Sequence, residues 1–584
     1  MGNLPRKTKL FPDPHFQNQL NMDRRTTIAR LLGQKITDAA VKSAASFDAA
    51  AVVSGLAPYT GPFGFDQAAH LLRRTTFGAT YQQMKDVASM GMDAAMELLL
   101  AVPAVPDPPV NPNFTDDPNT PIGTTWVDKA VTPNVVGFSA YRDQSLRSWT
   151  LNLIRSEGVS IHEKMVLFWH NHFPTTDLND ARYVYKYASL LRQFALGNFR
   201  EMTKAMTIEP AMLRYLNGRD NTAASPNENY ARELLELFTI GKGPLVGPND
   251  YTNYTEQDVV EMAKVLTGWV DNILNTPSNQ TVIQSINSFF APNRHNTTTK
   301  QLSYRFNDIQ IPDMGNLEYA HLIDIIFSKD ECAKFICRKL YLWFVYYDIT
   351  QQVEDEVIAP MAQILVDNDY EIQPALEALL RSEHFFDILN VGPMIKNPVD
   401  FTMGVFKTFD IDFSNANLEQ EYRVLWQTFR TTLSTMQMPY YDPPSVAGWK
   451  AYYQEPVFYR HWISSVTLPI RQTFTNRVLV QGFSNTGFTA RVDVLKFVAT
   501  LDTPEIADDL IDELVRILFP QPITQFQHDF LKGILLPGLP DYEWNIEYGD
   551  YVNNPNDVNL ANAVKSKLTN LLSAMMSMPE YYLS

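Results

Sequence analysis

The chain has 584 residues, of which 45% are hydrophobic and 12% aromatic, so it can bury a large core and is neither a disordered tail nor a fibre. It carries 48 Lys and Arg against 65 Asp and Glu, and the net charge of −17 argues against a broad phosphate-binding surface, which excludes nucleic acid as an expected partner. The two cysteines, Cys332 and Cys337, are too few for a disulfide scaffold, and their spacing fits neither a zinc knuckle nor a redox pair. We expect two buried thiols.

Residues 1–60 form a polar, Ala-rich N-terminal extension. Within it, residues 22–33 place Arg24 and Arg25 before a short apolar run, as in a twin-arginine export signal. Polar residues from Gln34 onward interrupt the run before it reaches the roughly 7 to 15 apolar residues of an export signal. Two interpretations stay open: a degraded signal of a periplasmic or cell-envelope protein, and a short amphipathic helix of a cytoplasmic one. No apolar run reaches the roughly 20 residues of a membrane span, so the protein is not expected to be transmembrane.

Helical spacing of apolar residues dominates the chain after residue 61. Eight prolines in residues 103–133 predict a long surface loop that faces a partner. Residues 280–306 have the alternation of one short hairpin, and residues 540–557 are expected to be a loop. The fold class is therefore mainly α: a large multi-helix body with long irregular loops and at most a short β-hairpin. The expected helices span residues 65–74, 84–100, 145–157, 162–172, 181–196, 228–241, 256–269, 317–327, 333–347, 375–380, 506–518 and 564–576.

Two histidines, His170 and His172, end the predicted helix 162–172 just before Pro174. If the last turn unwinds, both can face a divalent metal, because imidazole is the commonest protein ligand for zinc, iron or copper. Hydrogen-bonded histidines that end a helix are the simpler alternative, since their positive form also suits a helix C-terminus.

Charged side chains recur at four-residue steps along the predicted helix 228–241, where Glu228, Arg232 and Glu236 share a face and Glu233 lies beside them. A solvated ladder of this kind is worth only about 0.3 to 0.5 kcal/mol per pair. If the face is instead buried against the His170 helix, the carboxylates of Glu228 and Glu233 become candidate catalytic groups or ligands, with Arg232 holding one of them ionised.

Two tryptophans are candidate pocket residues. Trp269 follows Gly268, and Trp449 ends a turn stiffened by prolines, although tryptophan packs in cores more often than it recognises ligands. The chain lacks a glycine-rich dinucleotide fingerprint, a phosphate-binding loop, a Gly-x-Ser-x-Gly elbow and a His-Glu-x-x-His motif. Nucleotide hydrolysis and serine-hydrolase chemistry are therefore disfavoured.

Six motif segments follow one another along the chain: residues 70–78, 165–173, 227–241, 254–269, 396–399 and 443–449. Together they resemble the bacterial "domain of unknown function 1800" family, over a match from about residue 65 to the C-terminus. The resemblance implies an exported envelope protein, often encoded beside a sulfatase-like or phosphatase-like partner. One departure is His295-Asn296-Thr-Thr-Thr-Lys300, where relatives tend to carry His-Asp-x-Gly-x-Lys, and it puts a function of that acid in doubt.

These patterns lead to one functional hypothesis and one alternative. We expect binding or assembly with a protein or glycan partner, with contacts from the 103–133 loop and the aromatic segment 440–462. The alternative is a metal-dependent hydrolase in which His170, His172 and Glu233 hold a metal that activates water. A helical core, 61–480, carries the motifs, and a C-terminal helical subdomain, 481–584, packs on it. One polar pocket is expected to gather His70, Arg73, His170, His172, Glu228, Arg232 and Glu233, and Asn227, Trp269 and Trp449 are further binding candidates.

Overall fold

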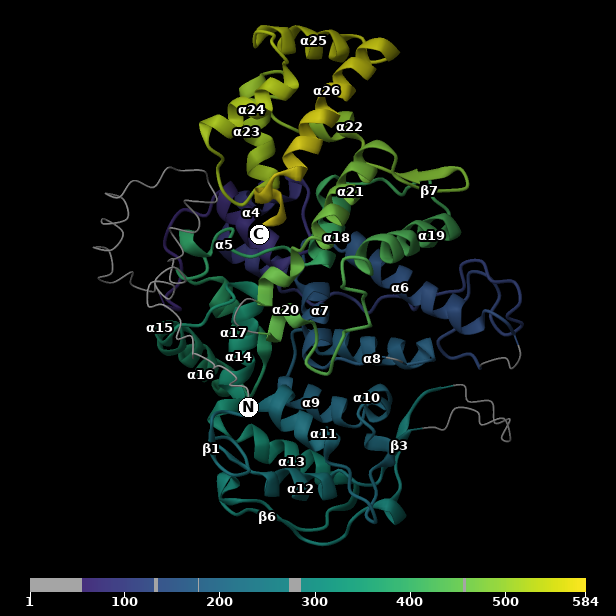
Figure 1. Cartoon of the computed structure of the whole chain (residues 1–584), viewed down its shortest axis with the longest axis vertical. Coiled ribbons are helices and arrows are strands. Elements are labelled where there is room, and N and C mark those ends of the chain that lie inside the picture. Colours follow the sequence, from purple (N-terminus) through teal and green to yellow (C-terminus); the bar gives the residue numbers. More distant parts are fainter. Residues whose placement is uncertain (1–54, 131–134, 177, 272–284, 455–457) are drawn as a thin grey trace, which may run out of the picture.

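Helices make up most of the computed structural model, which confirms the mainly α class. They stack along one long axis, with α25 (Tyr542–Asn553) and α26 (Val558–Ser577) at one end and α12 (Glu256–Val265) and α13 (Glu318–Phe327) at the other (Figure 1). Among the helices that the structure describes, none is both long and apolar enough to cross a membrane. The export-like segment lies outside the described residues, which are 55–130, 135–176, 178–271, 285–454 and 458–584.

The middle of the molecule is built around α7, which matches the predicted span and is apolar or buried on nearly every side. A helix of this kind belongs in a core, because it leaves no polar face for solvent. α7 packs on α8, and α6 packs on α8, α18 and α19. The bounds in this layer are α4 (Phe65–Thr75), α5 (Tyr81–Leu99), α6 (Phe138–Ser156), α7 (His162–His172), α8 (Ala181–Gln193), α18 (Pro398–Thr408), α19 (Leu418–Thr428) with η8 (Phe429–Leu433), and α20 (Lys450–Tyr453).

A lower lobe holds α12, α13 and three of the four hairpins of the described chain. One hairpin was expected within residues 280–306. In the described part of that stretch, 285–306, strands β4 and β5 each pair with a partner outside it. The helix expected over 256–269 ends early. Gly268 turns the chain at φ +95°, a conformation that residues other than glycine rarely adopt, and Phe290 and His295 crowd the position. The bounds are α9 (Phe199–Thr207), α10 (Pro210–Tyr215), α11 (Glu228–Glu233), η2 (Leu234–Thr239), β1 (Leu245–Gly247), β2 (Asp250–Tyr251), β3 (Trp269–Asp271), β4 (Ser288–Phe290), β5 (Lys300–Gln301) and β6 (Gln310–Ile311).

The flank of the body is formed by α14, whose buried face includes both cysteines, as expected. Burial raises the pKa of each thiol, which keeps both protonated and inert. Three elements of the described chain, η2, η6 and η8, are π-helical. The bounds are α14 (Asp330–Phe344), α15 (Gln351–Val353), η6 (Glu354–Ile358), α16 (Ala359–Asp367) and α17 (Ile372–Leu380).

The C-terminal lobe contains a helix where a loop was expected: α25 lies within residues 540–557. That expectation was wrong because Trp544 and Tyr548, one turn apart, are buried, and the Trp544 indole donates to the carbonyl of Pro504 at 2.9 Å. Tertiary packing thus outweighs a sequence rich in Asn, Asp and aromatic residues. The other bounds are α21 (Thr467–Val480), β7 (Phe483–Asn485), β8 (Phe488–Ala490), α22 (Val494–Val498), α23 (Ala507–Leu518) and α24 (Gln525–Leu535).

The Pro-rich stretch is irregular through residue 130, as predicted, and residues 131–134 lie outside the described chain. Its inner side is docked on α6, because the Trp126 indole is buried and donates to Ser145 Oγ at 3.0 Å. Asp117 accepts from Arg142 at 3.2 Å, and both side chains are buried. Its apolar tips, Val105 and Ile122, are exposed.

Candidate functional site

Three of the motif segments meet at one cleft of about 800 Å³ in the middle of the molecule. The end of α7 contributes His172, η2 contributes Glu236, and the turn before Trp449 contributes Ala447. The opposite wall is α14, with Lys339 at its centre. A cleft of this size lies within the range of about 300 to 1,000 Å³ that is usual for small-molecule sites.

The C-terminal end of η2 fixes the polar groups of the cleft. Helix ends leave carbonyls without intrahelical partners, and these attract donors and positive charge. The Leu237 carbonyl accepts from Lys339 Nζ at 2.8 Å, and the Phe238 carbonyl accepts from His172 Nε2 at 3.0 Å. Since a carbonyl only accepts, Nε2 carries the proton, and His172 Nδ1 accepts from Lys339 Nζ at 3.1 Å.

Lys339 is a half-buried lysine whose amine has no balancing charge. Within the described chain, no carboxylate oxygen lies within 4.0 Å of its Nζ. Burial therefore lowers the pKa of Lys339 from 10.5 to about 7. Burial, with the neighbouring Lys339, also lowers the pKa of His172 well below 6.5. Near neutral pH the cleft thus presents an amine that is partly uncharged, beside an uncharged imidazole.

Aromatic rings cover much of the remaining wall. The ring of Trp343 lies 4.3 Å from that of Tyr452 and meets Phe168 edge to face at 5.6 Å. At the rim, Arg338 binds both oxygens of Glu354, at 2.6 and 2.9 Å. The cleft therefore combines apolar faces with a fixed set of hydrogen-bonding groups.

His170, the other predicted metal ligand, lies behind the cleft with both ring nitrogens bound by protein groups. Its Nε2 accepts from the Tyr441 backbone N–H at 3.2 Å, so Nδ1 carries the proton and donates to Tyr187 Oη at 2.8 Å. Tyr187 Oη donates in turn to the Phe173 carbonyl at 2.7 Å. Burial, followed by the charge of Arg147, lowers the pKa of His170 to about 3, so the ring is neutral.

His70 and Arg73 lie elsewhere, where the C-terminal lobe meets the body. His70 Nε2 donates to the Phe385 carbonyl at 3.0 Å, and burial lowers its pKa to about 3. Arg73 donates to the carbonyls of Arg516 and Ile517 at the end of α23. Both side chains hold helix α4 against later parts of the chain.

The charged side chains on α11 form the solvated ladder of the first alternative, and this ladder extends to a neighbouring helix. Arg232 binds both oxygens of Glu256 on α12, each at 2.8 Å, and also Glu228 at 3.3 Å. Glu233 is half-buried, and burial followed by the charge of Glu236 raises its pKa. Asn227 caps the helix by accepting from the Asn229 backbone N–H at 2.9 Å. The structure therefore ties Arg232 to α12. Of the expected seven pocket residues, only His172 lines the cleft.

The two tryptophans separate as well. Trp449 is buried beside the His170 ring, and its backbone N–H donates to Asn171 Oδ1 at 3.0 Å. Gly448 precedes it at φ +87°, with Asn171 where a Cβ would stand, so only glycine lets this turn close on the end of α7. Trp269 is half-buried in the lower lobe and packs against Phe290 and Tyr319.

Sequence reasoning missed Lys339. A signal was present, because Phe335, Lys339 and Trp343 occur at four-residue steps in a helix that was predicted. On such a helix the three side chains share one face, so a lysine stands in the middle of an aromatic stripe. An unpaired charge is costly to bury in a core, so a lysine at that position indicates the wall of a cavity.

Residues 70–583 match the model of the family described as "Protein of unknown function (DUF1800)". No curated protein and no solved structure matches the chain. The matched region contains the three segments that form the cleft.

Proposed function

From the membership of this chain in the DUF1800 family and the chemistry of its cleft, we propose that it is a binding protein of the cell envelope whose cleft takes a glycan. One observation carries the proposal: residues 165–173, 227–241 and 443–449 are far apart in the chain and converge on the same cleft of about 800 Å³. The export-like residues 22–33 and the resemblance described above support the envelope, and a sulfatase-like or phosphatase-like partner protein belongs to the same proposal.

The wall chemistry supports a glycan over a protein segment. Sugar rings present apolar C–H faces and a rim of hydroxyls, which suit aromatic side chains beside fixed donors and acceptors. Trp343 and Tyr452 provide the apolar faces, and Asn171, Glu236 and Arg338 provide the polar groups. Tyr452 and Tyr453 come from the aromatic segment 440–462 that was expected to contact a partner.

The hydrolase alternative draws less support from the geometry. It needs free ring nitrogens on His170 and His172 and a carboxylate from Glu233 beside them. Each of the four ring nitrogens has a protein partner instead. Binding is therefore the function that the cleft supports best.

Titration of the purified chain with soluble envelope-derived oligosaccharides, followed by calorimetry, tests this proposal. Tyr453 lines the cleft and is 41% exposed, so Tyr453→Ala removes a contact surface without opening the core. We expect affinity to fall by about two- to twelvefold, because one aromatic contact is worth about 0.5 to 1.5 kcal/mol.

Tyr542→Ala is the matched control, because Tyr542 is equally aromatic, exposed, and lies on α25 away from the cleft lining. It is expected to bind as the unaltered chain does. Absence of binding to every oligosaccharide, or equal loss in both variants, would overturn the proposal.

A further inference from the structure

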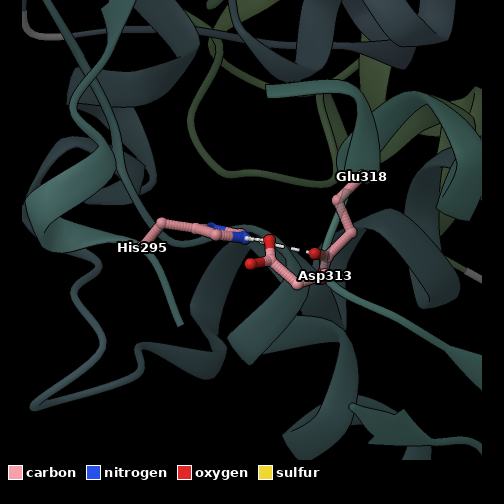
Figure 2. Close-up of side chains that lie close together, drawn as sticks. All are labelled: His295, Asp313 and Glu318. Carbon is pink, nitrogen blue, oxygen red and sulfur yellow. Dashed lines mark hydrogen bonds and ion pairs between the residues drawn. The ribbon is translucent and has the colours of Figure 1, made fainter. Parts of the chain in front are cut away.

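A histidine and two carboxylates converge in the lower lobe, outside the cleft lining. Figure 2 shows His295, Asp313 and Glu318 pointing toward one another, and one ligand atom from each lies within 4.8 Å of the other two. We propose that His295 Nε2, Asp313 Oδ1 and Glu318 Oε2 form a binding site for a divalent transition-metal ion.

Three separate chain segments build the cluster. His295 follows the single turn η3 (Pro292–Arg294), Asp313 follows β6, and Glu318 is the first residue of α13. His295 and Glu318 are buried, at 6% and 0% exposed, whereas Asp313 is exposed. The site therefore has an inner wall that is fixed and an outer ligand that leaves an entry path from solvent.

The hydrogen bonds of His295 leave its inner nitrogen facing acceptors. Nδ1 lies 2.9 Å from the carbonyl of Thr267, so Nδ1 carries the proton of the neutral ring. Nε2 then turns a lone pair toward Glu318 Oε2 at 3.1 Å and Asp313 Oδ1 at 3.6 Å. Three electron-rich atoms facing one another need a cation among them, either a proton on Nε2 or a metal ion.

Outer contacts hold the carboxylates in the orientation that a metal requires. Glu318 Oε2 accepts from the Met314 backbone N–H at 3.2 Å, while the buried Lys300 pairs with the other oxygen. Asp313 Oδ1 accepts from the Gly315 backbone N–H at 3.0 Å. Such second contacts, with the Thr267 carbonyl on His295, fix ligands around metals in proteins generally.

The donor set selects the class of ion. One imidazole nitrogen and two carboxylate oxygens suit Zn²⁺, Mn²⁺ or Fe²⁺, whereas Mg²⁺ and Ca²⁺ prefer oxygen ligands alone. Ligand atoms 3.1 and 3.6 Å apart match the edges of a coordination shell with bonds of about 2.0 to 2.2 Å. With three protein ligands, such an ion keeps a position open to water or a ligand.

The substitution at Asn296 leaves this cluster intact. The Asn296 side chain accepts from the Thr298 backbone N–H at 3.0 Å, and so it faces its own turn. The Asn296 carbonyl accepts from Lys300 Nζ at 2.6 Å. His295 and Lys300 thus reach Glu318 without an acid at position 296.

Calorimetric titration of the chelator-treated full chain with Zn²⁺ and with Mn²⁺ tests the site, with Mg²⁺ and Ca²⁺ as comparisons. We expect one transition-metal ion per chain, and at least tenfold weaker binding of Mg²⁺ and Ca²⁺. Asp313→Asn is expected to lower the affinity for Zn²⁺ and Mn²⁺ at least tenfold. The fold is retained in this variant, because Asp313 is exposed and asparagine keeps the oxygen that accepts from Gly315.

Two further variants make the outcome unambiguous. Asp367→Asn, an exposed aspartate on α16, is expected to bind as the unaltered chain does. His172→Gln should also leave the stoichiometry at one, since His172 belongs to the cleft. Visible absorption of bound Co²⁺ gives a second readout, whose band is expected to shift in Asp313→Asn only. Absence of stoichiometric binding, equal affinity in Asp313→Asn, or loss of the ion in His172→Gln would each overturn the proposal.

Discussion

Lys339 has its amine at the end of a helix and in the wall of a cleft at the same time. The carbonyl of Leu237 and the ring of His172 accept its hydrogen bonds, and both favour the charged form. Burial without a carboxylate partner works against that form, and the pKa of about 7 shows that burial has the larger effect. Burial therefore lowers the pKa values of both His172 and Lys339.

The first prediction concerns the reactivity of Lys339. With a pKa of about 7, nine-tenths of the amine is neutral at pH 8, against well under one per cent of a lysine at the ordinary value of about 10.4. Brief acetylation of the folded chain, read by peptide mass spectrometry, is expected to modify Lys339 at a rate that is half-maximal near pH 7. The exposed Lys496, which has a raised pKa, serves as the internal control. Its acetylation rate should keep rising with pH up to pH 10 and beyond, without a plateau.

The same shift has a defined sign for stability. Between pH 7 and 10.5 the unfolded chain binds a proton at Lys339 that the folded chain does not, so this residue adds stability as pH rises through that window. Below pH 7 the cost of burying the charge is present in full. Lys396, whose pKa burial also lowers to about 7, contributes with the same sign.

In the acetylation experiment, a labelling rate at Lys339 that rises with pH without a plateau would contradict the lowered pKa.

Among the helices, the spans read from periodicity agree with the structure where one apolar face is continuous. The stripe of α23 is an example, and the helix at 162–172, which is buried on nearly every side, also has the expected span. The spans fail where a single contact decides: Gly268 stops α12, and buried Trp544 creates α25. Both the close approach of Phe290 to Gly268 and the packing around Trp544 involve residues distant in the chain, so local sequence does not reveal them.

The second prediction tests that account of α25. Trp544→Ala removes a fully buried side chain and an indole hydrogen bond to Pro504, and is expected to destabilise the lobe by about 3 to 5 kcal/mol. Denaturant unfolding followed by circular dichroism measures the loss, and limited proteolysis is expected to cut first within residues 540–557.

Phe526→Ala on the neighbouring α24 is the control, since that side chain is 81% exposed and its removal should cost under about 0.5 kcal/mol. If Trp544→Ala were as stable as the control, packing of Trp544 would not be the reason that α25 forms.

For the whole molecule, the contacts of α26 bear on the predicted boundary at residue 480. α26 packs on α21, where Ser573 Oγ donates to Asn476 Oδ1 at 2.7 Å. The ring of Tyr581 meets that of Phe401 edge to face at 5.9 Å, and the backbone of Tyr582 accepts from Lys396 N–H at 2.8 Å. The subdomain 481–584 therefore shares its core with residues on the other side of the boundary.

The third prediction follows from this sharing. A fragment of residues 481–584 is expected to show helical circular dichroism without a cooperative thermal transition, because α26 exposes its apolar stripe when α21 is missing. Fragment 465–584, which restores α21, is expected to regain a cooperative transition. Cooperative melting of the shorter fragment would establish 480 as a true domain boundary.

The sequence by itself determined the mainly α class, the places of most helices, the buried thiols, and the family resemblance, because helical periodicity and motif order are properties of neighbouring residues. It also identified three of the segments that line the cleft, but not the wall formed by α14. Only the tertiary structure decided that His172 meets Lys339, that Arg232 turns to Glu256, and that His295 meets Glu318. Burial and long-range contact set protonation and exposure, and both depend on residues far away in the chain.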